Sequence, residues 1–197
     1  LQNDPDHRCG GNADCGRFME IWNLVFIQYN RDRAGNLSPL PEKHVDTGMG
    51  FERVVAIKQG VASNYDTDLF LPLIAHICDV TGQPYEEEST AVAMRVLADH
   101  VRTLTFAISD GALPSNEGRG YVLRRILRRA ARFGRTLNQH EPFLYRLVPA
   151  VVDVMGAAYP EICDSQERVA KIIKSEEEGF GRTLDRGIEL FDDTVES

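Results

Sequence analysis

The sequence has no long apolar run and few cysteines. No uninterrupted apolar stretch approaches the ~20 residues that a membrane helix needs, and residues 1–10 are polar, unlike a signal peptide. We therefore expect a soluble, cytoplasmic protein with no membrane partner. The four cysteines are widely spread, so reduced thiols are expected rather than a disulfide framework.

Several catalytic and metal-binding patterns are also missing. The sequence contains no Ser-His-Asp order, no His-Glu-x-x-His run and no Cys-x-x-Cys pair, so hydrolytic and redox chemistry have no motif to support them. His7, Cys9 and Cys15 come nearest to a metal-ligand group. Their spacing matches no standard zinc pattern and a fourth ligand is missing. We expect no metal site in this chain.

The 197 residues, 43% of them hydrophobic, suffice for one or two packed domains. Residues 20–30 form a β-branched and aromatic run typical of a buried strand. A turn around residues 32–36 and a second strand ending near Thr47 predict an antiparallel pair. A helix is expected from Gly50.

The rest of the chain shows helical spacing of apolar residues. One helix is expected to begin within Leu69–Ile77, and a second is expected to contain Leu97, Val101, Leu104 and Ile108. Two more are expected over residues 143–158 and from about residue 166 to 195. Another has Val122, Ile126, Ala130 and Phe133 as its predicted apolar face. The predicted fold class is α+β, with short strands and a helix in residues 1–60 and an all-helical domain in residues 61–197.

Charge is distributed unevenly along the chain. The net charge of −8 by itself argues against a nucleic-acid partner. Between Gly118 and Arg135, however, there are seven arginines and no acid, which leaves −15 on the remainder. An arginine-rich helix face is usually only solvated. Here no acidic residue lies within the segment to form the i,i+4 ion pairs of ordinary surface helices, and this favours contact with RNA. The predicted stripe is Arg124, Arg128, Arg132 and Arg135, with Arg125 and Arg129 beside it.

The segment from Val45 to Val55 combines a strand, two glycines and the start of a helix. Gly48 and Gly50 allow a ligand to approach the backbone, the helix start offers unpaired N–H groups, and Arg53 adds a fork of donors. Asp46 is suited to hold an ammonium group. A glycine-punctuated turn is more often plain structure, so this pattern alone is not specific for phosphate binding.

Together, residues 20–30, 45–55, 63–70, 95–102 and 114–125 resemble the alanyl-tRNA synthetases, a class II aminoacyl-tRNA synthetase family. The resemblance covers nearly the whole chain from Gly16 onward. It implies that residues 1–60 are the end of the catalytic domain and residues 61–197 a helical domain that recognises the tRNA acceptor stem. It further implies an internal fragment of an alanine–tRNA ligase, without the first two class motifs or the editing domain.

The resemblance also implies ligand contacts. ATP is expected at Ile21, Trp22, Asn23, Gly50 and Arg53, and alanine at Asn23, Val25, Asp46 and Gly48. The tRNA acceptor stem is expected at Asn116, Arg119, Arg124, Arg125, Arg128, Arg129 and Arg132. Mg²⁺ is expected with ATP, whereas zinc is expected only in the editing domain. No residue of this chain is assigned covalent chemistry, because adenylate formation depends mainly on orientation and charge neutralisation.

Simpler interpretations remain open for several of these residues. Trp22, Val25 and Phe26 suit a packed core, and Asp46 suits a turn. Asn116 suits reading of a guanine-uracil wobble pair, capping of a helix before Glu117, or both roles together. A set of residues at helical spacing, Arg95, Asp99 and Arg102, predicts a structural ion pair. The alternative function is a non-catalytic RNA-binding helical module, and a purely structural helical protein is a third.

Overall fold

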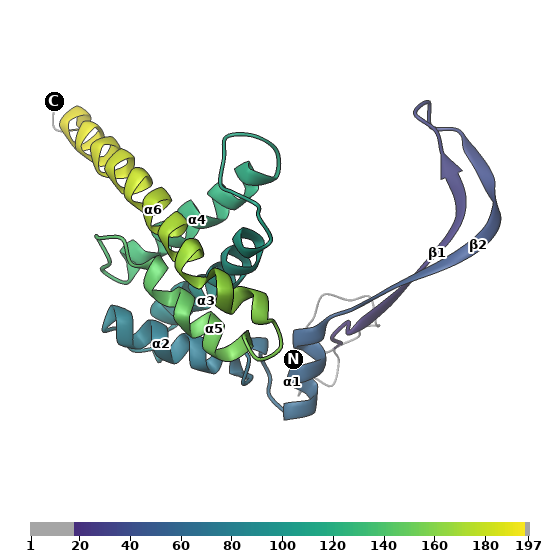
Figure 1. Cartoon of the computed structure of the whole chain (residues 1–197), viewed down its shortest axis with the longest axis horizontal. Coiled ribbons are helices and arrows are strands. Elements are labelled where there is room, and N and C mark those ends of the chain that lie inside the picture. Colours follow the sequence, from purple (N-terminus) through teal and green to yellow (C-terminus); the bar gives the residue numbers. More distant parts are fainter. Residues whose placement is uncertain (1–17, 196–197) are drawn as a thin grey trace, which may run out of the picture. The chain divides into compact units, whose positions relative to one another are not determined.

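The structure is a computed structural model that describes residues 18–195. Its described residues form two compact units that part between Thr67 and Asp68. The first unit holds a two-stranded antiparallel sheet and a helix, and the second is helical (Figure 1). The predicted α+β class is confirmed.

The hairpin of the first unit consists of β1 (Trp22–Arg31) and β2 (Leu37–Met49). Asp32 closes its turn, because the two carboxylate oxygens accept the backbone and side-chain N–H groups of Asn36 at 2.8 and 3.0 Å. These hydrogen bonds lower the pKa of Asp32. The predicted antiparallel pair is therefore confirmed, with its turn in the expected place.

The predicted burial of the first strand is wrong. Every residue of β1 is exposed, including Phe26, with 66% of its surface accessible. Composition suited β1 to a packed surface, but a two-stranded ribbon cannot bury a face without a third strand or another packed layer. The interpretation of Trp22, Val25 and Phe26 as core residues fails for the same reason.

Helix α1 (Phe51–Gln59) follows β2 directly. Gly60 ends it in the left-handed conformation, with φ of 70°, a region that glycine enters without steric cost. A short 3₁₀ turn, η1 (Asn64–Asp66), comes next and begins at Ser63, whose hydroxyl accepts the N–H of Tyr65.

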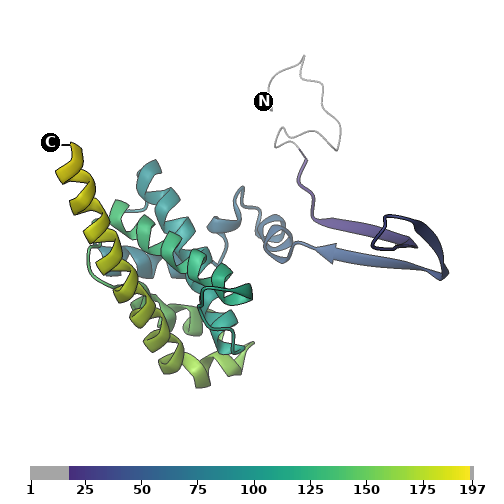
Figure 2. The ribbon, with the colours of Figure 1, turned by 90° about the horizontal axis from the view of Figure 1, so that it is seen from above.

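The second unit is built around α3 (Glu88–Ser109). This helix packs against α2 (Leu71–Thr81), α4 (Gly118–Thr136), α5 (Val148–Met155) and α6 (Pro160–Val195). The predicted helical positions of α3 are buried, among them Leu97, Val101, Leu104 and Ile108. Helix α5 (Val148–Met155) follows a 3₁₀ segment, η2 (Leu144–Leu147). The 36-residue helix α6 (Pro160–Val195) runs beside α3, α4 and α5 (Figure 2). It begins about six residues before the predicted start.

Helix α4 (Gly118–Thr136) carries the arginines, and its predicted apolar face is displaced by one position. The buried residues are Gly120, Leu123, Leu127, Ala130 and Gly134, whereas Val122 is 54% exposed. The predicted stripe begins at Val122 and the observed stripe begins at Leu123, one position along the helix. Apolar residues recur at helical spacing in both stripes, so periodicity alone did not distinguish them. Contact with Phe143 favours the observed stripe, because a Cβ on Gly134 would lie 2.3 Å from the ring.

Candidate functional site

The first candidate site is one face of the hairpin, near the end that joins α1. Asn23 pairs across the strands with Gly48, and Val25 pairs with Asp46. Directly opposed residues in an antiparallel pair lie on the same face, as do residues two apart on one strand. The four residues predicted to contact alanine therefore share one face. The register shift between Ile27 and Tyr29 lies farther along the hairpin and leaves these pairs in place.

The chemistry of this face is polar with one aliphatic position. Asp46 is exposed, and its Oδ1 accepts the backbone N–H of Thr47 at 2.9 Å. The amide of Asn23 donates to Oε1 of Glu20 at 3.4 Å. Gly48 keeps the space beside Asn23 open, since a Cβ there would lie 3.4 Å from Oδ1 of Asn23. An acceptor carboxylate, an amide and a small aliphatic side chain can together surround a small zwitterion.

Trp22 lies on the opposite face of β1 from Asn23 and Val25. Its indole N–H donates to Oγ1 of Thr47, whose strand partner is Leu24. The structure thus places Trp22 apart from the four residues predicted to contact alanine. Trp22 and Asn23 were both predicted to contact ATP, yet they lie on opposite faces of β1.

The start of α1 brings the remaining predicted ATP residues together. The N–H of Gly50 donates to the carbonyl of Ile21 at 2.9 Å, which ties the strand end to the helix start. Arg53 donates from its guanidinium to the carbonyl of Glu20 at 2.6 Å. A Cβ on Gly50 would lie 3.2 Å from Cδ of Arg53, so glycine lets the arginine fold back over the turn. The N-cap residue of α1 is Gly50, which has no side chain to cap the first N–H groups of the helix, and this is compatible with the predicted anion-accepting turn.

The second candidate site is the arginine face of α4. Arg125, Arg128, Arg129 and Arg132 are exposed there, and so is Arg119 in the first turn. Three of these guanidinium groups lie over aromatic rings: Arg125 over Tyr121 at 5.7 Å, Arg128 over Phe180 at 5.2 Å and Arg129 over Phe133 at 5.7 Å. Such contacts orient a guanidinium without neutralising its charge. These residues form a cationic surface suited to phosphate groups.

The other two arginines of the predicted stripe pair with α6. Arg124 forms an ion pair with Glu176 at 2.6 Å, and Arg135 forms one with Asp185 at 2.6 Å. Both acids lie far from their partners in the sequence, at separations of 52 and 50 residues, so local spacing did not predict these pairs. The absence of acids within α4 therefore did not mean that all its arginines lack partners.

Asn116 does not cap α4. The N-cap residue is Glu117, and Ser115 supplies the local hydrogen bonds: its hydroxyl donates to the carbonyl of Glu117 at 2.9 Å and accepts its N–H at 3.4 Å. Oδ1 of Asn116 instead accepts a hydrogen bond from the guanidinium of Arg124. The helix-cap interpretation of Asn116 is wrong, and its side chain is exposed.

The predicted ion pair in α3 is present between Arg102 and Asp99. Arg102 lies 3.5 Å from Asp99, whereas Nε of Arg95 donates to the hydroxyl of Tyr85 at 2.7 Å. Nearby, burial and the guanidinium of Arg129 lower the pKa of His100. The half-buried His100 is thus favoured in its neutral form next to the arginine face.

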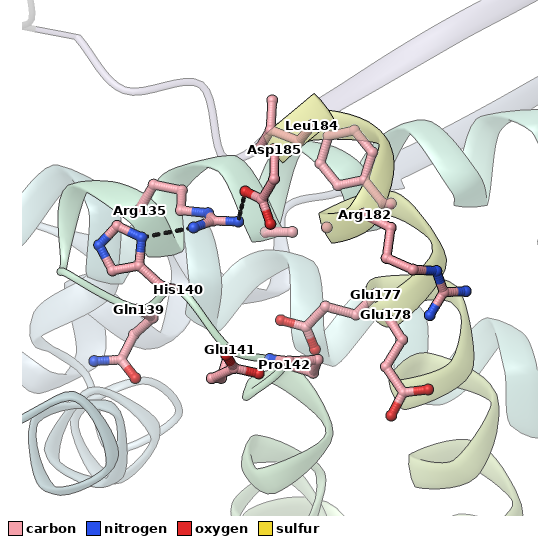
Figure 3. A pocket seen from close by; sticks show the side chains of 13 residues that line it. Arg135, Gln139, His140, Glu141, Pro142, Glu177, Glu178, Arg182, Leu184 and Asp185 are labelled. Atoms are coloured by element: carbon pink, nitrogen blue, oxygen red, sulfur yellow. Dashed lines mark hydrogen bonds and ion pairs between the residues drawn. The ribbon is translucent and has the colours of Figure 1, made fainter. Parts of the chain in front are cut away.

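A pocket of about 280 Å³ lies between the end of α4, the segment before η2 and α6. Arg135 lies between His140 and Asp185 at this pocket (Figure 3). Glu177 is buried at its wall and accepts the N–H groups of Phe143 and Leu144 at 3.1 and 3.0 Å. Burial raises the pKa of Glu177 to about 7, although the two N–H donors act in the opposite direction. No sequence pattern singled out this residue.

Metal binding and membrane insertion gain no support from the described residues. Among the side chains that the structure describes, no group of three or more from His, Cys, Asp or Glu could hold a metal ion. His7, Cys9 and Cys15 lie outside the described residues. Cys78 and Cys163 are free thiols. None of the described helices is both long enough and apolar enough to cross a membrane.

Comparison with known proteins gives consistent matches. The family described as tRNA synthetases class II (A) matches residues 3–197. The alanine–tRNA ligase of Chlorobium phaeobacteroides is 60% identical over 187 residues, which cover 93% of this chain and 21% of that protein. The enzymes of the same name from Chlorobium phaeovibrioides and Carboxydothermus hydrogenoformans are 57% and 53% identical, covering 99% and 98% of this chain and 22% of each relative. The chain thus spans about a fifth of the length of these curated relatives.

Proposed function

The chain belongs to the class II (A) tRNA synthetase family, and we propose that it forms part of a cytoplasmic enzyme that joins alanine to its tRNA at the expense of ATP. The observation that carries this proposal is the cross-strand register. It gathers Asn23, Val25, Asp46 and Gly48 on one face of the hairpin. An RNA-binding module would have no use for that set of residues.

In the proposed reaction, the carboxylate of alanine attacks the α-phosphate of ATP, and pyrophosphate leaves. Asp46 pairs with the ammonium group and Asn23 donates to the carboxylate. Val25 limits the space available to the side chain, so that a methyl group is accepted more readily than a larger one. This chain's contribution to the step is therefore to orient alanine.

ATP is proposed to lie at the junction between β1 and α1. Gly50 allows the phosphates close to the backbone, and Arg53 and the start of α1 offset their charge. Ile21, Trp22 and Asn23 are the strand residues assigned to ATP, with Trp22 on the face away from alanine. The family implies Mg²⁺ with ATP, but the described residues offer no cluster of ligands for it, so no step is assigned to the metal.

The tRNA acceptor stem is proposed to lie along α4. The exposed Arg119, Arg125, Arg128, Arg129 and Arg132 are suited to the phosphates, and Asn116 to the edge of a guanine-uracil wobble pair. Arg124 was expected to contact the stem. Its hydrogen bonds to Glu176 and Asn116 support an indirect role instead.

Pyrophosphate exchange by the full-length protein tests the catalytic part of this proposal. Exchange is expected with alanine and not with valine, whose larger side chain conflicts with Val25. Glycine and serine are the closer competitors and measure how strictly the pocket excludes other small side chains. Acceptor-stem binding without exchange by any amino acid would overturn the proposal in favour of an RNA-binding module.

A further inference from the structure

Arg124 connects two residues that lie far apart in the sequence. Its Nε lies 2.6 Å from Oε1 of Glu176, and its NH2 group donates to Oε2 at 3.0 Å. Its NH1 group donates to Oδ1 of Asn116. One guanidinium therefore donates a hydrogen bond to a carboxylate on α6 and another to the amide that precedes α4, and its Nε lies at ion-pair distance from the same carboxylate.

The ion pair is sheltered, whereas the amide is exposed. The side chains of Arg124 and Glu176 are only 20% and 19% accessible. One hydrogen bond from the NH2 group and the ion-pair contact of Nε, each to a different carboxylate oxygen, restrict the plane of the guanidinium. An exposed asparagine on a loop would otherwise be free to rotate its amide. The sheltered pair therefore holds the exposed side chain in one orientation.

We propose that Glu176 is a positioning residue for recognition of the acceptor stem, which it affects by holding Arg124 against Asn116. This inference rests on the proposed function, in which Asn116 reads a base pair. Because arginine only donates hydrogen bonds, it fixes Oδ1 of Asn116 toward itself and leaves the NH₂ group to donate to the RNA. Asn116 thus reads an acceptor atom on a base edge.

The test compares the whole protein with Glu176→Gln, which keeps the shape of the side chain but removes the charge that holds Arg124. Affinity is measured by filter binding for two acceptor stems, one with the wobble pair and one with an ordinary pair. The ratio of the two affinities is expected to fall about tenfold. Glu178→Gln is the matched control, since it removes the same charge from α6 two residues away, where the neighbour is Lys174 at 4.0 Å. It should change both affinities alike and leave their ratio unchanged.

A double-mutant comparison shows whether Glu176 acts through Asn116. In an Asn116→Ala background, Glu176→Gln should produce no further loss of the ratio. A second variant, Arg124→Lys, can still pair with Glu176, but lysine lacks the planar set of donors needed to hold Asn116 as well. It should therefore lower the ratio of the two affinities. This variant keeps the proposal testable if Glu176→Gln does not fold. Glu176→Asp should restore most of the ratio, because it retains the charge.

Two outcomes overturn the inference in different ways. If Asn116→Ala lowers the ratio while Glu176→Gln and Arg124→Lys leave it intact, the positioning role is wrong and base reading by Asn116 stands. If Asn116→Ala itself leaves the ratio unchanged, base reading fails, and the positioning role fails with it. Melting curves for each folded variant separate these results from a general loss of stability.

Discussion

Val25 lies directly opposite Asp46 in the hairpin. This pair places an aliphatic side chain next to a carboxylate on one exposed face, with Asn23 and Gly48 forming the next pair of that face. Val25 can thus make a hydrophobic contact with a ligand next to the point where Asp46 can pair with a positive charge. This is the combination required by a ligand that has a methyl group and an ammonium group on the same carbon.

We expect Asp46→Asn in the full-length enzyme to weaken alanine binding much more than ATP binding. The substitution removes the charge partner of the ammonium group and leaves the turn around Gly50 intact. Loss of a charge-assisted hydrogen bond costs about 1.5 to 3 kcal/mol, or roughly tenfold to a hundredfold in affinity. Separate titrations with alanine and ATP measure the two effects. Equal weakening of both would remove Asp46 from the alanine pocket.

Arg53→Ala should have the opposite pattern, with ATP affected most. A lost guanidinium–phosphate contact is expected to reduce ATP affinity roughly tenfold to a hundredfold, as measured by ATP titration. Lys58→Ala is the control, because Lys58 is an exposed cation in the last turn of the same helix. Arg53 also binds the carbonyl of Glu20, so melting curves are needed to detect a loss of local structure. Unchanged ATP affinity and adenylate formation would refute the phosphate assignment.

The sequence was sufficient to predict this hairpin but not its environment. The β-branched run and the turn around residues 32–36 predicted the antiparallel pair, and the register of that pair places Asn23, Val25, Asp46 and Gly48 on one face. Their contact with alanine stays a prediction that rests on the family resemblance. Burial was predicted wrongly, because composition shows which surface is suited to packing and not whether a packing layer is present. The predicted division of ATP contacts among Ile21, Trp22 and Asn23 stays a prediction.

The acids of α6 illustrate the limit of local patterns. Glu176, Glu177 and Glu178 are identical neighbours, yet the first pairs with Arg124, the second is buried against two backbone N–H groups and the third faces Lys174. Helical rotation of 100° per residue points them in three directions. Their roles depend on partners that are distant in the sequence, which i,i+4 rules do not include.

Glu177 predicts a pH-dependent stability. Its pKa rises from an ordinary 4.5 in the unfolded chain to about 7 in the folded chain. The folded state therefore holds this proton more tightly. The contribution of Glu177 to stability is greatest below pH 4.5 and is lost as the pH rises to about 7. At about 1.4 kcal/mol per pH unit, the stability of the native protein relative to Glu177→Gln should fall by about 2 to 3 kcal/mol between pH 5 and 8.

Urea unfolding of the native protein, Glu177→Gln and Glu178→Gln at several pH values measures this difference. The native protein and Glu178→Gln, which keeps the buried carboxyl group, should follow nearly the same pH dependence. A constant difference between the native protein and Glu177→Gln from pH 5 to 8 would show that Glu177 ionises in the folded state as it does in the unfolded chain.

The exposed arginines of α4 should control RNA affinity without controlling base-pair preference. If Arg128 and Arg132 meet phosphates, replacing both with glutamine should weaken binding to wobble and ordinary stems alike. It should also reduce the slope of log affinity against log salt by about 2, or about 1 for each contact. Arg135→Gln is the matched control, because Arg135 already pairs with Asp185 at 2.6 Å. It should lower the melting temperature and change the salt slope much less.

Filter binding at several salt concentrations measures the salt slope of each variant. Equal slopes for the double variant and the native protein would place the acceptor stem elsewhere.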